Sequence, residues 1–167
     1  MDNLLIIGAG SFATEIEELA RLNNYTDIAF LDDNPDKALA HPVIGSMKDI
    51  EKYRAIYDNA IVVMGNNENR LKYHKMLEAA GFNIPVLIHP RSYVSPDAKL
   101  SPGCIIRTFA VVGRYAELGK AVILNLGSKV DHHCVIGEGS HLLINSVVRA
   151  SKTAEPLTWL DAGQVIQ

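Results

Sequence analysis

Three of the six histidines in the chain fall within the twelve residues VDHHCVIGEGSH, at positions 130–141. Imidazole titrates near neutral pH, so it can accept a proton during catalysis, and neutral imidazole is also a common zinc ligand. His132, His133 and His141 therefore suit a general base with its helpers, a metal site, or solvated surface histidines. We favour the base and expect no metal, because adjacent histidines at a turn should point apart and no accompanying carboxylate pattern is present.

Composition narrows the setting for these histidines. A chain of 167 residues has room for one or two domains, and its net charge of −3 argues against a nucleic-acid partner. Two cysteines are too few for a disulfide framework, and no apolar run approaches the length of a membrane span. The opening MDNLLIIGAG lacks the basic start of a signal peptide. We expect a cytoplasmic protein with no membrane partner.

The first half of the chain alternates short apolar runs with helical periodicity. NLLII leads through a glycine turn into GAGSFATEIEELARL, in which Ser11 is a plausible N-cap. DIAFL, AIVVM and IPVLI read as further strands, and a polar start to a helix follows Gly65. This alternation predicts a Rossmann-like domain with a parallel sheet over residues 1–87.

The second half follows a period of six. Its large anchors are Ile88, Val94, Leu100, Ile106, Val112, Leu118, Leu124, Val130, Ile136, Leu142, Val148, Ala154, Leu160 and Ile166, of which only Ala154 is not a large aliphatic. Four residues after most anchors the side chain is small. Hexapeptide repeats of this kind form parallel β-helices, so we expect one over residues 88–167. Cys104 and Cys134 occupy small inward positions and should be core residues.

Five stretches together carry a family resemblance. They are IIGAGSFATEI, FLDDNPD, PVIGS, HPRSYVSPDA and ILNLGSKVDHHCVIGEGSH. With these stretches the chain closely resembles the bacterial sugar O- and N-acyltransferases typified by sialic acid O-acetyltransferases and by acetyltransferases of UDP-linked 4-amino sugars. The resemblance covers nearly the whole chain. It implies a left-handed β-helix, a homotrimer with sites between subunits, and acetyl-CoA as co-substrate.

The resemblance also implies roles for the polar residues of the second half. His132 matches the general base, which takes a proton from the sugar's amine or hydroxyl, and Asn125 and His141 match supporting positions. His133 departs from the family, because many members carry a carboxylate there that orients the base and stabilises its charged form. A protonated His133 would instead oppose a positive charge on His132.

Two more residues of the β-helix are expected near the cofactor. Trp159 lies three hexads beyond His141, so it should stack on it and either wall the acyl-CoA groove or cap the subunit interface. Ser140 is the second expected cofactor contact. Relatives usually continue for several more hexads, and here the last hexads are irregular, so we expect a shortened groove and a frayed end.

In the first half the glycine turn could hold a phosphate at a helix N-terminus, and the acidic pair after the second strand could bind ribose or base. The turn could equally serve only strand-to-helix packing, and the acidic pair could be turn residues. The resemblance favours a nucleotide-sugar site. The residues expected to contact substrate are Gly8, Gly10, Ser11, Phe12, Asp32, Asp33 and Gly65.

Two functional hypotheses follow. The first is an acyl-CoA-dependent acyltransferase acting on a sugar or nucleotide sugar in surface-glycan biosynthesis, with His132 as base. The second is a catalytically weakened trimer that binds a nucleotide sugar or a partner. The retained trio of Asn125, His132 and His141 favours the first hypothesis, and His133 with the shortened repeat favours the second.

Overall fold

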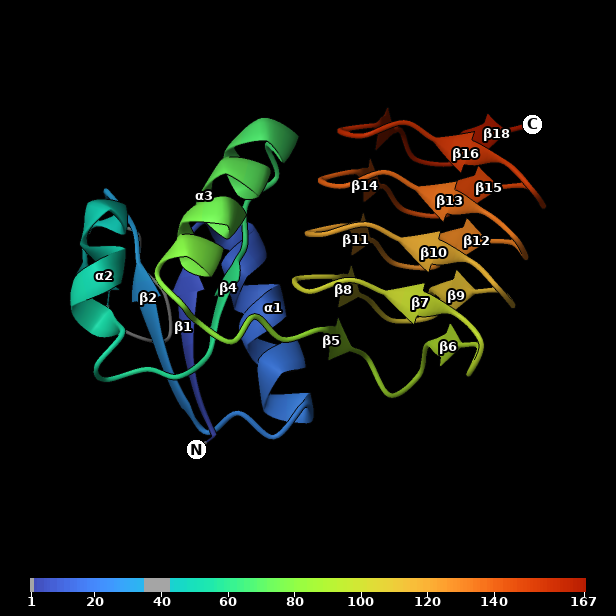
Figure 1. The fold of residues 1–167 in the computed structure, drawn as a ribbon. Coiled ribbons are helices and arrows are strands. Elements are labelled where there is room, and N and C mark those ends of the chain that lie inside the picture. The colour runs from blue at the N-terminus through green and yellow to red at the C-terminus, as the bar shows by residue number, and fades with distance from the viewer. Residues whose placement is uncertain (1, 35–42) are drawn as a thin grey trace. The chain divides into compact units, whose positions relative to one another are not determined.

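The computed structural model describes residues 2–34 and 43–167, which form two compact units, Met1–Pro85 and Val86–Gln167 (Figure 1). Residues 35–36 of the stretch FLDDNPD and Pro42 of PVIGS lie outside the described residues. The two units differ in architecture, because the first combines helices with a parallel sheet and the second consists of stacked short strands.

The N-terminal unit contains a parallel sheet in the order β3-β2-β1-β4. The strands are β1 (Asn3–Ile7), β2 (Asp27–Leu31), β3 (Val43–Gly45) and β4 (Ala60–Val62). The helices are α1 (Ser11–Leu22), the 3-10 turn η1 (Met47–Asp49), α2 (Ile50–Tyr53) and α3 (Asn67–Ala79). The expected alternation of strands and helices around a parallel sheet is confirmed.

Continuous apolar runs explain why these strands form the centre of the unit. All five residues of β1 and all three of β4 are buried. Strands of a parallel sheet are usually covered on both faces, which selects such runs over alternating patterns. One apolar core contains Leu5, Ile7, Ala29, Leu31, Ile50, Tyr57, Ala60, Val62, Leu77, Phe82 and Ile84. The sheet is therefore a rigid support for the loops at the carboxyl ends of its strands.

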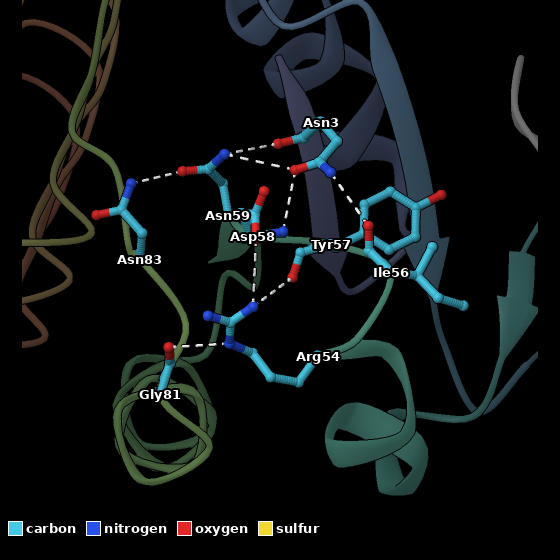
Figure 2. A network of polar contacts seen from close by, with 8 residues as sticks. All are labelled: Asn3, Arg54, Ile56, Tyr57, Asp58, Asn59, Gly81 and Asn83. Atoms are coloured by element: carbon cyan, nitrogen blue, oxygen red, sulfur yellow. Dashed lines mark hydrogen bonds and ion pairs between the residues drawn. The ribbon is translucent and has the colours of Figure 1, made fainter. Parts of the chain in front are cut away.

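A network of polar contacts joins the amino end of β1 to the residues that directly precede β4 (Figure 2). The side chain of Asn3 accepts from the Asp58 amide at 3.0 Å, and Asn59 donates to the Asn3 carbonyl at 3.0 Å. Asn83 donates in turn to the side chain of Asn59 at 2.5 Å. Paired in this way, the buried amides Asn3 and Asn59 avoid the cost of unsatisfied polar groups.

The second unit is a β-helix of two-residue strands in three parallel sheets (Figure 1). The strand orders are β16-β13-β10-β7, β17-β14-β11-β8-β5 and β18-β15-β12-β9-β6. The strands are β5 (Leu87–Ile88), β6 (Tyr93–Val94), β7 (Lys99–Leu100), β8 (Ile105–Ile106), β9 (Val111–Val112), β10 (Glu117–Leu118), β11 (Ile123–Leu124), β12 (Lys129–Val130), β13 (Val135–Ile136), β14 (His141–Leu142), β15 (Val147–Val148), β16 (Thr153–Ala154), β17 (Trp159–Leu160) and β18 (Val165–Ile166).

The period of six is confirmed as the period of the strands, and it corrects one expectation. The run IPVLI adds no strand to the N-terminal sheet, because Ile88 pairs with Ile106 and begins the hexad register. The last hexads also keep their strands: Ala154 pairs with Ile136, and β17 and β18 continue the stack.

The interior of the β-helix is a column of anchors and small residues. Cys104 and Cys134 lie in this column with no exposed surface, as expected. Burial raises the pKa of the Cys104 thiol to about 12 and also raises that of Cys134. Both thiols therefore stay protonated at neutral pH and act as small apolar core groups.

From Gly103 onward, the turns of the β-helix place one residue per hexad in the left-handed region. These residues are Gly103, Phe109, Tyr115, Ala121, Gly127, His133, Gly139, Asn145, Ser151, Leu157 and Gly163. Only four are glycines, although other residues pay about 1–2 kcal/mol for this conformation. His133, with φ of 56°, is therefore held in a strained conformation by the coil.

Candidate functional site

The glycine turn after β1 is shaped by close backbone contacts. Gly8 has φ of 101°, and a Cβ there would lie 2.5 Å from the carbonyl oxygen of Val63. The Ala9 amide donates to Oδ2 of Asp32 at 2.7 Å, and the Asn34 amide donates to Oδ1 at 2.8 Å. Asp32 is buried and ties the turn to the end of β2. Both carboxylate oxygens therefore organise the loops, which sequence reasoning did not foresee.

These loops enclose a pocket of about 410 Å³ within the N-terminal unit. It is lined by Gly8, Gly10, Ser11, Phe12, Asp32, Met47, Val63, Met64, Gly65, Asn66 and Asn69. Six of the seven expected substrate contacts are thus brought together. A pocket of this size falls in the range that holds small ligands.

Two helices begin at this pocket. Gly10 is the N-cap of α1, and Ser11 is its first residue, so the expectation that Ser11 caps the helix is wrong. Asn66 is the N-cap of α3 and accepts from the Asn69 amide at 2.8 Å. Helix N-termini carry partial positive charge and unpaired amides, which favour anions. The pocket is thus suited to phosphate groups.

The two pocket glycines Gly10 and Gly65 differ from Gly8. A Cβ at either position would meet no atom within 4 Å. The fold therefore does not demand glycine at these positions. Open space above a backbone that lines a pocket allows a ligand to approach closely.

Asp33 is the expected substrate contact that lies apart from this pocket. Its Oδ1 accepts from Ser46 Oγ at 2.5 Å and from the Met47 amide at 3.1 Å. It lines a neighbouring pocket of about 320 Å³, which Asp32 and β3 share. The side chain of Asp33 thus anchors the turn between β3 and η1.

Arg70 is a residue of this region that sequence reasoning missed. It is fully buried on α3 and donates to the carbonyl of Met64 at 2.7 Å and to the side chain of Asn67 at 2.9 Å. Burial lowers the pKa of Arg70 to about 10, so the guanidinium remains charged at neutral pH. It fixes the loop that forms one wall of the pocket. An arginine in a mostly polar helix offers no sequence signal for this role.

In the β-helix, His132 and His133 lie exposed on the turn between β12 and β13. Their Nδ1 atoms are 3.0 Å apart, and the ring centroids are 5.2 Å apart at an interplanar angle of 89°. The expectation that adjacent histidines diverge is therefore wrong. The left-handed backbone at His133 turns the chain so that both rings share one side.

Residues of the preceding coil lie beside this pair. The ring of Tyr115 is 5.0 Å from that of His133, and the guanidinium of Arg114 lies 4.7 Å over the Tyr115 ring. Arg114 Nε donates to Oδ2 of Asp97 at 2.6 Å. His133 thus has an aromatic neighbour that is itself held by a cation and an ion pair.

A second polar cluster joins Asn125, His141 and Trp159. Arg107 donates to Oδ1 of Asn125 at 2.6 Å, and Nδ2 of Asn125 lies 3.4 Å from Nε2 of His141. His141 pairs in register with Trp159, and their rings are 5.0 Å apart at 74°, so the expected stacking is confirmed. Arg107 was missed, although it lies eighteen residues before Asn125, which is one coil in this repeat.

Ser140 is placed differently from the other expected cofactor contact, Trp159. Its side chain is fully buried, donates to the carbonyl of Glu155 at 3.1 Å, and accepts from the Thr158 amide at 3.2 Å. Trp159 is half exposed. The hydroxyl of Ser140 therefore links two coils inside the β-helix, while the indole of Trp159 faces outward.

Gly113 lies directly beneath the histidine turn and gives a testable prediction. A Cβ there would be 2.8 Å from both the Asp131 carbonyl carbon and the His132 nitrogen. Gly113→Ala should therefore displace the peptide before His132, lower the free energy of unfolding by about 1–3 kcal/mol, and reduce kcat. Steady-state kinetics at a temperature where the variant is folded, with a thermal melt, would measure both effects.

Gly119→Ala is the matched control for this change. Its Cβ would lie 2.6 Å from the Glu138 nitrogen, a similar clash at a turn without a histidine. Both variants should lose stability, and only Gly113→Ala should lose kcat at equal folded fraction. Equal kcat losses in the two variants would show that the position of the His132 peptide does not matter.

Across residues 2–34 and 43–167, no three His, Cys, Asp or Glu side chains are grouped as metal ligands. Over the same ranges, no helix combines the length and apolar character needed to cross a bilayer.

Known proteins resemble both units. Residues 3–77 match the family model of the PglD N-terminal domain. The acetyltransferase domain of PglB from Neisseria gonorrhoeae is 30% identical, with 100% of this chain and 92% of that chain covered and a TM-score of 0.87. Its complex with acetyl coenzyme A gives 29% identity, 98% and 93% coverage and a TM-score of 0.77.

A mutant of perosamine N-acetyltransferase from Caulobacter crescentus, solved with CoA and GDP-perosamine, is also similar. It is 26% identical over 99% of this chain and 88% of that chain, with a TM-score of 0.85. The parallel N-terminal sheet, the left-handed β-helix that follows it and these full-length matches show that the chain belongs to the bacterial sugar acyltransferase family and is a sugar acetyltransferase.

Proposed function

We propose that the protein transfers an acetyl group from acetyl-CoA to the amine of a nucleotide-linked amino sugar, with His132 as general base. The observation that carries this proposal is the exposed imidazole of His132, which contacts a polar partner at a turn of the β-helix instead of packing into the core. The relatives solved with CoA, acetyl-CoA and GDP-perosamine support the two substrates.

The reaction needs a proton acceptor on the sugar side. The amine lone pair attacks the thioester carbonyl carbon, a C–N bond forms, and the C–S bond then breaks. Nε2 of His132 takes the proton that the amine loses and passes it to the departing thiolate, so the products are an amide and the CoA thiol. An imidazole suits both steps because it gains and loses protons near neutral pH.

The N-terminal pocket is the proposed nucleotide site. Its two helix N-termini, α1 and α3, favour the diphosphate, and the buried carboxylate of Asp32 holds the glycine turn in place. The open backbone at Gly10 and Gly65 leaves room for a close ligand. The largest apolar side chains that line the pocket are Phe12, Met47 and Met64.

We further propose a homotrimer in which Asn125, His141 and Trp159 of one subunit complete the site of another. One face of the β-helix supports association, because Tyr93, Val111, Val147 and Val165 lie in register on it, with Lys129 between Val111 and Val147. Tyr93 is 58% exposed and Val165 is 44% exposed, which is unusual for apolar side chains in register unless a partner covers them.

Isothermal titration of acetyl-CoA tests the proposal, alone and with UDP-, GDP- and CMP-linked amino sugars. We expect one acetyl-CoA site per subunit, altered by a matching sugar nucleotide, in a sample that light scattering shows to be trimeric. The nucleotide without its sugar is the control for sugar recognition. Sugar-nucleotide binding without acetyl-CoA binding would contradict the proposed transfer from acetyl-CoA and favour a protein that only binds the sugar nucleotide. A monomer in solution would rule out the site shared between subunits.

A further inference from the structure

The contact between His132 and His133 has a defined chemical meaning. Their Nδ1 atoms are 3.0 Å apart, a hydrogen-bond distance that allows one proton between them. If both atoms carried protons, the two N–H groups would repel each other. One ring must therefore donate from Nδ1, and the other must accept at Nδ1.

The ring of His133 has an aromatic neighbour on the coil below. The amide of His133 donates to the carbonyl of Arg114 at 2.9 Å, and its ring lies against Tyr115 at 5.0 Å. Tyr115 is in turn covered by the Arg114 guanidinium, which is paired with Asp97. His133 is thus fixed by the coil below, while His132 has His133 as its aromatic neighbour.

Charged groups around the pair are of both signs. Asp131 uses Oδ1 to accept from the His132 amide at 2.7 Å. Arg114 lies on the coil below with its charge paired to Asp97. The turn of the coil above, at residues 149–152, carries Arg149 and Lys152. Among the described residues, the direct side-chain partner of the His132 ring is the ring of His133.

We propose that His133 is the positioning residue of the base: its neutral ring accepts the Nδ1 proton of His132 and so leaves the lone pair of His132 Nε2 free for the sugar amine. This inference rests on the proposed function. His133 then holds its own proton on Nε2. When His132 takes the amine proton at Nε2, its Nδ1–H bond to His133 strengthens, because the donor has become charged.

In this arrangement the proposed base, His132, has no anionic side chain among the described residues hydrogen-bonded to its ring. A carboxylate next to an imidazole both fixes its tautomer and stabilises the imidazolium. His133 fixes the tautomer and supplies no negative charge. The protein should therefore remain active to a lower pH than a version with a carboxylate at this position, since less of the base is lost to protonation.

Three substitutions at position 133 separate geometry from charge. Glycine, asparagine and aspartate all accept the left-handed conformation that this position requires. Oδ1 of Asn or Asp is attached to Cγ, as Nδ1 of His is, so it occupies the place of the accepting atom. His133→Gly removes the acceptor, His133→Asn restores a neutral one, and His133→Asp supplies a charged one.

We expect His133→Gly to lower kcat at least tenfold with little change in KM. His133→Asn should restore kcat to within about threefold of the natural protein, with an unchanged pH profile. His133→Asp should move the acid limb of the kcat/KM profile to higher pH, because its carboxylate stabilises protonated His132. Asn145→Asp, an added carboxylate at another left-handed turn, is the control and should leave the limb in place.

A readout independent of turnover is the ring tautomer of His132. Long-range ¹H–¹⁵N spectra of the labelled protein, recorded with both rings neutral, should show the Nδ1–H tautomer of His132 in the natural protein and in His133→Asn. His133→Gly should lose this preference, since no acceptor remains.

The inference is overturned if His133→Gly keeps full kcat, if His133→Asn is as slow as His133→Gly, or if His132 carries its proton on Nε2. These outcomes leave the proposed function intact as long as His132→Ala is inactive. Full activity of His132→Ala would instead show that His132 is not the general base, and the tautomer of its ring would then have no role in catalysis.

Discussion

Replacing His132 with alanine should lower kcat for acetyl transfer by about 10²–10⁴-fold, the usual contribution of a general base. The affinity for acetyl-CoA should change little, because the exposed imidazole acts on the sugar amine and not on the binding of the donor. The loss should appear in kcat and in kcat/KM alike. Such a result would assign the proton acceptor of the proposed reaction to this side chain.

Release of CoA measured with a thiol reagent gives the rate directly. Cys104 and Cys134 have no exposed surface, and burial raises the pKa of both thiols, so the folded protein should contribute little background. His89→Ala is the matched control, since it removes a histidine of the same β-helix that caps a local turn by accepting from the Arg91 amide. An unchanged rate in His132→Ala would contradict the assignment.

The repeat explains which parts of the β-helix could be predicted. A large aliphatic every six residues is needed to fill each coil, so the spacing of Ile106, Val112 and Leu118 is enough to indicate the fold. The register of the repeat also placed Trp159 on His141, because residues eighteen apart stack in successive coils. Long-range packing is readable from sequence where it is strictly periodic.

Side-chain directions at the turns were harder to foresee. Phe109, Tyr115 and Leu157 adopt left-handed conformations that their residue types disfavour, and only their place in the period indicates this. The same conformation at His133 brings its ring to His132, which overturned the expected divergence. The side chains of adjacent residues point to opposite sides in extended backbone. A residue with positive φ is not extended, so its side chain can lie on the same side as that of its neighbour.

The sequence predicted residues that lie at the N-terminal site, but it did not predict the hydrogen bonds that join them. Glycine turns and acidic strand ends have known meanings, so Gly8, Gly10 and Asp32 were expected at the site. Sequence could not show that Asp32 bonds the Ala9 amide or that Arg70 holds the loop at Met64. These bonds join separate segments and depend on how the strands pair and where the helices begin.

Gly8→Ala should destabilise the N-terminal unit by about 3 kcal/mol or more, the second large effect that we expect. The added Cβ would lie 2.5 Å from the Val63 carbonyl oxygen, and φ of 101° is unfavourable for alanine. Two probes separate the units in the full chain. All helices of the described ranges lie before Pro85 and dominate the circular dichroism at 222 nm, while Trp159 is the only tryptophan and reports on the β-helix.

Gly10→Ala is the partner variant that distinguishes the ligand from the fold. Its φ of −68° and ψ of 177° suit alanine, and no atom lies within 4 Å of the added Cβ, so the helical transition should shift by less than about 1 kcal/mol for the weaker N-cap. The Cβ would nevertheless occupy the pocket, and titration should show nucleotide-sugar affinity falling tenfold or more. Gly8→Ala should lower the midpoint of the unfolding transition followed by circular dichroism at 222 nm. It should leave the midpoint of the transition followed by Trp159 fluorescence unchanged. If Gly10→Ala binds the nucleotide sugar as well as the natural protein does, the glycine turn serves packing alone and the nucleotide lies elsewhere.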